Sequence, residues 1–461
     1  MDVLAMDKKA KPKPKGQETI TAQKQTTPKL QTGPRMQVIV VGAGGGPFED
    51  GATSMLVRST SKDWTTNCLL AVDAGCHLAA MARIIEEHTT SDSKRPITLK
   101  SGPFQGLSLP HINKNANALH ITKELVQTFV ITHPHLDHTS GFIFATAGMD
   151  FKRQKKLAAL PSTIQAFRQF IFNGIVWPNL SDQHGGVKLV SYYELTDGGE
   201  PTIEDGGYVT LAEGLDVMAM RITHGNCRLQ HFSHTMQGDA EKRPSRSYSI
   251  STAISTTGVP RDLKTETPPG GGYKTEFNTE RTFSAQDDEC PVDSTAVFIR
   301  DVASKQEIII FGDVEPDTIS IRPLNKYVWE KAAPKIVAGR LKAIFIESSF
   351  TDAKEDDYLF GHLTPKYIFQ EMKSLAAMVQ ALGGPPNNPK KRRRLVGGKS
   401  TSSLYDGPLS GIKVVIIHVK DQVFDGPDPR VTIREELKGH EERERLGAQF
   451  FVSESGDSFY I

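Results

Sequence analysis

The chain has 461 residues and a formal net charge of +1, since 55 Lys and Arg residues are balanced by 54 Asp and Glu residues. This balance excludes the strongly basic surface of a dedicated nucleic-acid-binding protein. The composition, 38% apolar and 24% charged, is ordinary for a soluble globular protein, and no apolar stretch is long enough to cross a bilayer. We therefore expect neither a membrane nor an obligatory nucleic acid as a partner, and the four scattered cysteines predict reduced thiols.

The N-terminal part changes character near residue 36. Residues 1–35 contain the run KKAKPKPK and few large apolar groups, which predicts a disordered basic arm. Residues 37–41 then predict a strand, followed by the glycine-rich segment 42–47. A dinucleotide-binding GxGxxG pattern would need glycine at position 47, where proline stands, so we expect a tight turn near a ligand site.

The next expected elements are strands at 54–58 and 67–72 and a helix at 77–88. Asp73 follows the second strand, and a carboxylate at the end of a buried strand needs partners. It either caps the following helix or orients a loop that binds a ligand.

The segment ITHPHLDHTSG at 131–141 is the densest group of metal-capable side chains. It follows an expected strand at 126–132, and the apolar run from Phe142 is expected to begin a helix. Four such side chains fall within six positions: His133, His135, Asp137 and His138. Imidazole and carboxylate groups at this density are typical ligands of zinc-like ions. The alternating residues His133 and His135 can project to one side, and the adjacent residues Asp137 and His138 can turn to a second point. This arrangement suits two metal ions better than one.

The remaining expected elements extend to the C-terminus. They are helices at 163–172, 327–337, 365–382 and 432–445, and strands at 187–192, 215–222, 295–300, 307–311, 341–346, 412–417 and 449–452. Two low-complexity insertions are expected at about 228–289 and 383–411. The second holds the basic cluster from Lys390 to Arg394, which is either a nuclear-import signal or a solvated loop, so a cytoplasmic location is expected and a nuclear one stays open.

Three further polar residues, His224, Asp313 and His418, follow or end apolar strands. With the dense segment they give seven candidate metal ligands. The set divides into His133, His135 and His224 for one ion and Asp137, His138 and His418 for the other, with Asp313 as the bridge. Two ions roughly 3.5 to 4 Å apart can clamp a displacement at phosphorus and bring the pKa of bound water towards about 7.

The segment HPHLDHTSGF carries the HxHxDH signature and resembles the metallo-β-lactamase superfamily. Together with FGDVEPD at 311–317, IESSF at 346–350 and LFGHLTP at 359–365, it resembles the fungal-type class II cyclic nucleotide phosphodiesterases, the low-affinity cAMP phosphodiesterases. The resemblance extends from about residue 37 to the C-terminus, apart from the two insertions. It implies one domain at 36–461 with an α/β fold, an αβ/βα four-layer sandwich whose site lies at one edge.

The same resemblance implies an enzyme that hydrolyses 3′,5′-cyclic AMP, and also cyclic GMP, to the 5′-nucleotide and so down-regulates cAMP signalling. The seven ligand positions carry over without a gap, and Asp73 matches the aspartate that supports the loop. Two divalent ions are implied, with Zn²⁺ favoured, although the same donors accept manganese or iron. A homodimer is left open.

We assign catalytic roles to Asp137, which is also a ligand, and to His362 in the GHLTP segment. By analogy with the tRNA 3′-processing nucleases of the superfamily, His362 hydrogen-bonds a phosphate oxygen or protonates the departing 3′-oxygen. The alternative is a histidine that only packs at a helix N-terminus. Two other functions are kept, a tRNA 3′-processing endonuclease and an inactive metal-free scaffold, and the intact ligand set argues against the scaffold. Phe48, Phe350 and Tyr358 are considered for stacking on a purine, without an assignment.

Overall fold

Strands that are apolar at nearly every position need a cover on both faces, and two stacked sheets with outer helices provide it. The computed structural model describes residues 33, 35–89, 96–203, 206–227, 290–384 and 406–461, and residues 35–461 form one compact unit. Its strands form two seven-stranded sheets and one small two-stranded sheet.

The first large sheet has the strand order β16-β1-β2-β3-β6-β7-β8. Its strands are β1 (Met36–Gly42), β2 (Ser54–Ser59), β3 (Leu69–Ala74), β6 (Val126–Val130), β7 (Lys155–Ala159), β8 (Val190–Glu194) and β16 (Ser458–Tyr460). The strands from β3 through β6 and β7 to β8 are parallel, whereas β16, β1 and β2 pair in antiparallel fashion.

The second large sheet has the order β15-β14-β13-β12-β11-β10-β9. Its strands are β9 (Val209–Ala212), β10 (Leu215–Cys227), β11 (Cys290–Asp301), β12 (Glu307–Phe311), β13 (Leu341–Glu347), β14 (Lys413–Ile417) and β15 (Gln449–Val452). β12 to β15 are parallel, so their carboxyl ends lie at one edge of the sheet. The two-stranded sheet pairs β4 (Ile97–Thr98) with β5 (Ser108–Leu109).

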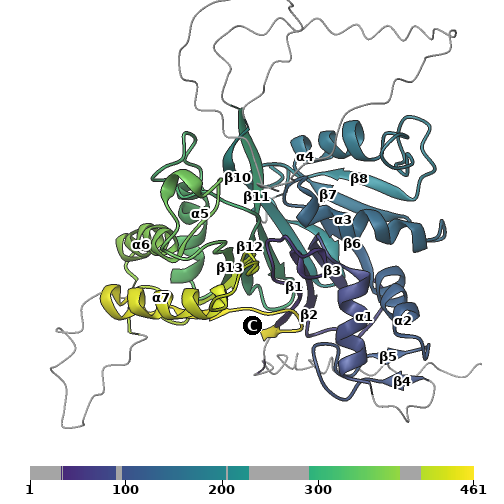
Figure 1. Ribbon diagram of the computed structural model, residues 1–461, viewed down its shortest axis with the longest axis horizontal. Helices are drawn as coiled ribbons and strands as arrows, with labels where there is room; N and C mark the ends of the chain where they lie inside the picture. The colour runs from purple at the N-terminus through teal and green to yellow at the C-terminus, as the bar shows by residue number, and fades with distance from the viewer. Residues whose placement is uncertain (1–32, 34, 90–95, 204–205, 228–289, 385–405) are drawn as a thin grey trace, which may run out of the picture. The chain divides into compact units, whose positions relative to one another are not determined.

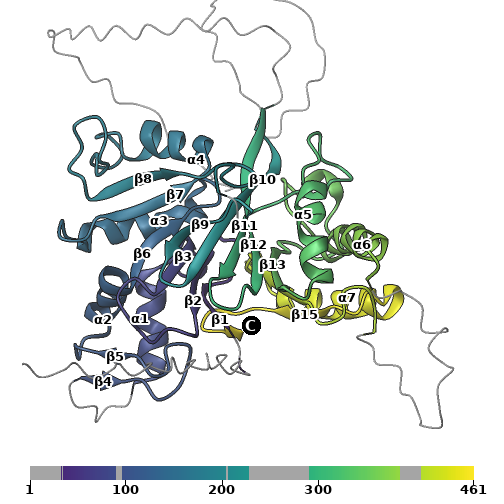
Figure 2. The same ribbon diagram turned by 180° about the vertical axis from the view of Figure 1, so that it is seen from behind.

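Helices cover the outer faces, with one group on either side of the two sheets (Figures 1 and 2). The first group is α1 (Leu78–Glu87), α2 (Lys114–His120), α3 (Leu136–Ala145) and α4 (Pro161–Ala166), and the second is α5 (Asn325–Val337), α6 (Pro365–Ala381) and α7 (Pro429–Glu444). Short turns of helix are η1 (Glu49–Gly51), η2 (Ile121–Leu125), η3 (Thr146–Gly148), η4 (Phe167–Ile171) and η5 (Asp356–Tyr358).

Three apolar cores follow from the two-residue period of the strands. On β2, Leu56 packs in the core under the first helix group, whereas its neighbours Met55 and Val57 pack between the sheets. On β13, Phe345 packs between the sheets and Ile344 packs under the second helix group. This is the αβ/βα four-layer sandwich expected from the resemblance, and that prediction is confirmed.

Most predicted helices and strands are present, but the helix of the histidine segment begins earlier than predicted. α3 starts at Leu136 and not at Phe142, so Asp137 and His138 lie on its first turn and not in a loop. Sequence patterns also did not predict β7, β9, β16 or α2. β7 begins with two lysines, and α2 is short and mostly polar, so neither shows the apolar spacing of a buried element.

The expected N-terminal arm and the insertions lie almost wholly outside the described residues. The insertion at 228–289 and the basic cluster from Lys390 to Arg394 both lie entirely outside the described residues. At the end of the second expected insertion, residues 406–411 are described, and Leu409 is fully buried. Within the described residues, no helix combines the length and the apolar character needed to cross a membrane.

Candidate metal centre

The seven predicted ligands come together at one place, to which both sheets contribute. His133 and His135 lie in the turn between β6 and α3, and Asp137 and His138 lie on the first turn of α3. The second sheet contributes the other three: His224 near the end of β10, Asp313 two residues after β12 and His418 directly after β14. Carboxyl ends of neighbouring parallel strands meet at one edge, which brings residues far apart in sequence together.

Two overlapping sets of ligand atoms form, each with all its members within 4.8 Å of one another. One set is His133, His135, His224 and Asp313, and the other is Asp137, His138, Asp313 and His418. Asp313 belongs to both sets because its carboxylate faces histidines of each. Its Oδ2 lies 3.8 Å from Nε2 of His133 and 3.7 Å from Nε2 of His224 in the first set. In the second set, its Oδ1 lies 3.1 Å from Nε2 of His138, and its Oδ2 lies 3.1 Å from Nε2 of His418.

Three of the histidines are oriented towards this centre by hydrogen bonds at their Nδ1 nitrogens. Nδ1 of His138 is 2.8 Å from Asp73 Oδ2, and Nδ1 of His418 is 2.6 Å from the Thr53 hydroxyl. Nδ1 of His224 is 2.9 Å from the carbonyl oxygen of Gly361. Such partners fix the tautomer and the ring orientation of a metal ligand, and here they leave Nε2 directed inwards.

Asp73 serves the histidine segment and does not cap a helix. Its Oδ1 accepts a hydrogen bond from the Thr132 backbone N–H (2.8 Å), and its Oδ2 accepts from the Thr132 hydroxyl (2.8 Å) as well as facing His138. The residue at the start of α1 is His77, four positions further on. Of the two roles considered for Asp73, orienting the loop is therefore the one it has.

Several buried polar atoms at the centre lack a partner within the described part of the chain. They are Nε2 of His133, His138 and His418, and Oδ1 of Asp313. His138 Nε2 is close to Asp313 Oδ1, but the geometry is not that of a hydrogen bond. A buried polar atom without a partner costs about 1–3 kcal/mol, so a group of four at one point calls for a ligand. Imidazole nitrogens and a carboxylate oxygen with these orientations fit a divalent cation.

Two histidines of the first set and the shared carboxylate have charge states that suit a cation. Burial lowers the pKa of His133 well below its usual value and that of His224 to about 4, so both are neutral, as a metal ligand must be. Burial opposes charge on Asp313, yet His138 and His418 attract its carboxylate and hold its pKa well below the usual range. The carboxylate that the two sets share is therefore an anion.

A third cluster adjoins the first set and contains Glu347, which was given no role from the sequence. Glu347 ends β13, and both of its oxygens lie 3.0 Å from His362 Nδ1. The carboxylate also accepts from the Val314 N–H (2.8 Å) and from the Ser349 hydroxyl (2.5 Å). Burial raises the pKa of Glu347 to about 7 and lowers that of His362 to about 4. Glu347 lies at the end of an apolar strand. The same kind of sequence position led to the prediction of Asp313 and could have identified Glu347 as well.

His362 lies beside the predicted ligands, as its assignment requires. Its ring centroid is 4.8 Å from that of His224 and 5.4 Å from that of His418. Among the aromatic residues considered for stacking, Phe350 has its ring centroid 6.0 Å from that of His362. Phe48 and Tyr358 are half exposed, at 51% and 47%.

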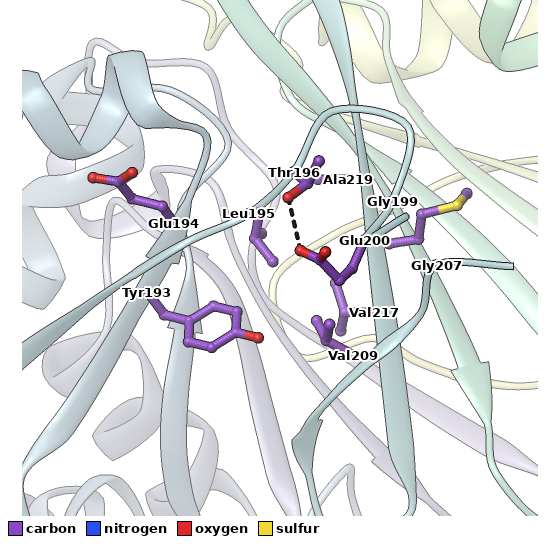
Figure 3. Close-up of a pocket in the computed structure, with 11 residues that line it drawn as sticks. Tyr193, Glu194, Leu195, Thr196, Gly199, Glu200, Gly207, Val209, Val217 and Ala219 are labelled. Carbon is purple, nitrogen blue, oxygen red and sulfur yellow. Dashed lines mark hydrogen bonds between the residues drawn. The ribbon is translucent and has the colours of Figure 1, made fainter. Parts of the chain in front are cut away.

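One small cavity lies apart from the centre, around Thr196, Glu200 and Val217 (Figure 3). Its volume is about 10 Å³, which is room for about one water molecule. The Thr196 hydroxyl donates to Glu200 Oε2 at 3.1 Å across its rim, as Figure 3 shows. A cavity of this size has no place for an organic ligand.

Comparisons with known proteins agree with this geometry. A 3′,5′-cyclic-nucleotide phosphodiesterase of Schizosaccharomyces pombe is 22% identical over 421 residues, which covers 91% of this chain and 91% of the relative. One from Candida albicans is 24% identical and covers 92% of this chain and 99% of the relative. The crystal structure of unliganded yeast PDE1 superposes with a TM-score of 0.59 at 20% identity, covering 93% and 100% of the two chains, and shows that the fold is shared.

The sequence model of the class-II cAMP phosphodiesterases matches residues 38–456, which is nearly the whole described unit. The match confirms the predicted resemblance and, with it, the predicted enzyme class, a phosphodiesterase. A chain with this match, this sandwich and this cluster of histidines and carboxylates belongs to the class-II cAMP phosphodiesterase family.

Proposed function

We propose that the chain hydrolyses 3′,5′-cyclic AMP, and cyclic GMP as a second substrate, to the 5′-nucleotide at a centre for two divalent ions. The observation that carries the proposal is the pair of four-residue sets that share the Asp313 carboxylate. The relatives named above are 3′,5′-cyclic-nucleotide phosphodiesterases and are matched over nine-tenths of the chain. An enzyme of this kind lowers the concentration of cyclic AMP and so down-regulates its signalling.

We assign the ligands from the two sets. His133, His135 and His224 hold one ion, Asp137, His138 and His418 hold the other, and Asp313 bridges them. The donors are imidazole nitrogens and carboxylate oxygens, for which zinc is a common partner. When bound, the two ions supply positive charge to the phosphoryl oxygens and lower the pKa of bound water.

His362 and Glu347 act on the leaving group. Glu347, whose pKa is raised to about 7, faces Nδ1 of the neutral His362 ring, so its carboxyl group donates to that nitrogen and holds the ring in one orientation with the ring proton on Nε2. Nε2 of His362 then transfers its proton to the departing 3′-oxygen while Nδ1 takes the proton of Glu347. Opening the cyclic diester leaves an alkoxide that needs this proton, and a positioned acid contributes about 10²- to 10⁴-fold in rate. Glu347 is a positioning residue, since it acts through the histidine.

The test of the proposal is incubation of the purified protein with cyclic AMP and chromatography for 5′-AMP, with and without added zinc or manganese. Metal analysis of the same preparation should find about two ions per chain. No turnover with metal present, together with cleavage of a precursor tRNA, would replace the proposal by the tRNA-processing alternative. A protein without metal or turnover would be the scaffold. Light scattering on this preparation decides whether a homodimer forms.

Variants of the acid pair test the assignment of His362. His362→Ala is expected to lower kcat by about 10²- to 10⁴-fold while the protein keeps its metal. Glu347→Gln retains a carbonyl oxygen but presents an amide to the ring, so we expect a smaller loss of kcat with KM little changed. Loss of metal from His362→Ala would show that His362 is a ligand and contradict the assignment.

A further inference from the structure

A large cavity opens beside the metal centre, with a volume of about 950 Å³. Its walls come from three segments that are far apart in sequence: 45–47, 349–354 and 420–432. Small-molecule sites in proteins commonly have volumes of about 300–1,000 Å³, so the cavity has room for an organic ligand.

The cavity and the centre share walls. A Cβ atom on Gly45 would lie 2.7 Å from Cδ2 of His418, so the Gly45 backbone touches the ring of a proposed ligand. Phe350, on the cavity wall, contacts the ring of His362 from the side. Lys420 lines the cavity and donates from Nζ to the Gly45 carbonyl oxygen at 2.6 Å. A molecule whose phosphate lies at the centre therefore has this cavity directly next to it.

The lining suits a flat aromatic group with polar edges. Phe424 and Val423 lie at the cavity with 80% and 51% of their surface exposed. The ring of Phe350 is already covered, since Lys354 Nζ stands 4.6 Å from its centroid, which leaves Phe424 as the aromatic face open to a ligand. Gln422 adds an exposed side-chain amide, which can both donate to and accept from a base edge.

The loop that carries Phe424 is fastened at its base to the glycine-rich turn. The Val419 N–H donates to Ala43 O (3.1 Å), and the Asp421 N–H donates to Gly46 O (2.9 Å). Arg430 Nη2 then donates to Asp421 Oδ1 at 3.2 Å. These bonds hold the two sides of the cavity at a fixed separation, so the site is built before a ligand arrives.

From these contacts we propose that this cavity binds the nucleobase of the cyclic nucleotide, with Phe424 stacking on the purine and Gln422 contacting its edge. The proposal rests on the proposed function, because it places the cyclic phosphate at the metal centre. Aromatic side chains and amides are the groups that proteins use for base stacking and base-edge contacts. Phe424 and Gln422 are then the residues that determine specificity.

The test compares three substrates: cyclic AMP, cyclic GMP and a ribose 3′,5′-cyclic phosphate without a base. For Phe424→Ala the ratio of kcat/KM for cyclic AMP to kcat/KM for the base-less substrate should fall by about 5- to 100-fold, mainly through KM, as expected for loss of one stacked base. The matched control is Phe151→Ala, which removes a Phe that is 69% exposed and does not line the cavity. The control should keep the wild-type ratio.

A second variant tests recognition of the base edge. Gln422→Glu offers only acceptors, so the preference should move towards cyclic GMP, whose guanine presents N1–H and N2–H₂ donors. An unchanged ratio in Phe424→Ala, or an equal loss on both substrates, would overturn the proposal. If the wild type cleaves the base-less substrate as well as cyclic AMP, the base site fails and the proposed function stands. If it cleaves neither, the proposed function fails.

Discussion

Replacing Asp73 by asparagine tests how the fold controls the metal centre. Asp73 is fully buried and has a positive φ of 54°, a conformation that asparagine adopts more readily than most residues. Asp73→Asn therefore keeps the backbone and the volume, and it changes only the charge and one acceptor. An alanine at this position would add backbone strain and leave a cavity, which would obscure the effect on the metal.

The size of the effect follows from the three hydrogen bonds that the carboxylate accepts. The asparagine carbonyl still accepts from the Thr132 N–H, so the amide faces His138 Nδ1. To accept from that amide, His138 must carry its proton on Nε2, the atom that faces Asp313. A protonated Nε2 cannot bind an ion. Loss of such an orienting partner costs about 10- to 100-fold in metal affinity, in agreement with about 1.5–3 kcal/mol for a charged hydrogen bond.

The assay is competition for zinc between the protein and a chelator, followed by turnover of cyclic AMP and thermal unfolding of the metal-free protein. We expect Asp73→Asn to bind metal about 10- to 100-fold more weakly, with turnover reduced in parallel at limiting metal. The control is Glu371→Gln on α6, a buried carboxylate that accepts from the Asp317 N–H (2.8 Å) and Trp329 Nε1 (2.6 Å) away from the centre.

Glu371→Gln should lower the unfolding temperature and leave the metal affinity as it is. Unchanged metal affinity in Asp73→Asn would refute the reasoning, because the hydrogen bond to His138 would then have no influence on ligation. A loss of stability alone, equal to that of Glu371→Gln, would make Asp73 an ordinary buried carboxylate.

Three further changes give distinct outcomes. Asp313→Ala removes the carboxylate shared by both ligand sets, so metal analysis should find little bound metal and cyclic AMP hydrolysis should be lost; turnover at the wild-type rate would contradict the bridging role. Gly45→Ala places a Cβ 2.7 Å from the His418 ring, so turnover should fall while circular dichroism stays native. Burial lowers the pKa of Lys155 to about 8, so the folded chain releases this proton before the unfolded chain, whose lysine titrates near 10.4. The free energy of unfolding of the wild type, relative to Lys155→Met, should therefore rise by up to about 3 kcal/mol between about pH 8 and 10.4 in denaturant titrations, and a fall would refute the assignment.

The positions of Asp313 and His418 could be predicted because the strands that precede them, β12 and β14, are buried on both faces. After a charged first residue, β12 (EIIIF) and β14 (KVVII) are apolar at every position, and the polar residue after such a run stands out. Since the carboxyl ends of parallel strands meet at one edge, the amino-acid sequence alone is enough to place Asp313 and His418 together.

The start of α3 was not predictable in this way, because contacts between backbones determine it. The segment from Leu136 to Gly141 has no apolar spacing. A Cβ on Gly75 would lie 1.7 Å from the Asp137 carbonyl oxygen, and a Cβ on Gly141 would lie 2.7 Å from the Cys76 carbonyl carbon. Two glycines thus let the first two turns of α3 lie against the chain after β3, and this close approach cannot be recognised from the hydrophobic pattern.

β7 and α2 were missed for different reasons. β7 begins at Lys155, whose ammonium group is buried and donates to the carbonyl oxygens of Lys123 and Val126, so a charged residue occupies a core position. α2 has few buried residues, so it lacks a hydrophobic pattern. Its N-cap residue, Asn113, accepts hydrogen bonds from the Asn115 and Ala116 N–H groups, and an asparagine at this position could have indicated the start of a helix.

The centre itself depends on the packing of the two sheets. The histidine segment belongs to the first sheet, and Asp313 belongs to the second, so neither sheet holds a complete ligand set. The turn after β6 contacts the second sheet directly: the Thr295 hydroxyl on β11 donates to Thr132 O at 2.7 Å, and a Cβ on Gly312, next to Asp313, would lie 2.5 Å from the Thr132 side chain. Thr132 is in turn held by Asp73, which also holds His138. A displacement at this contact between the sheets therefore moves the residues of both proposed ligand sets together, and the candidate metal centre responds to the assembly of the whole sandwich.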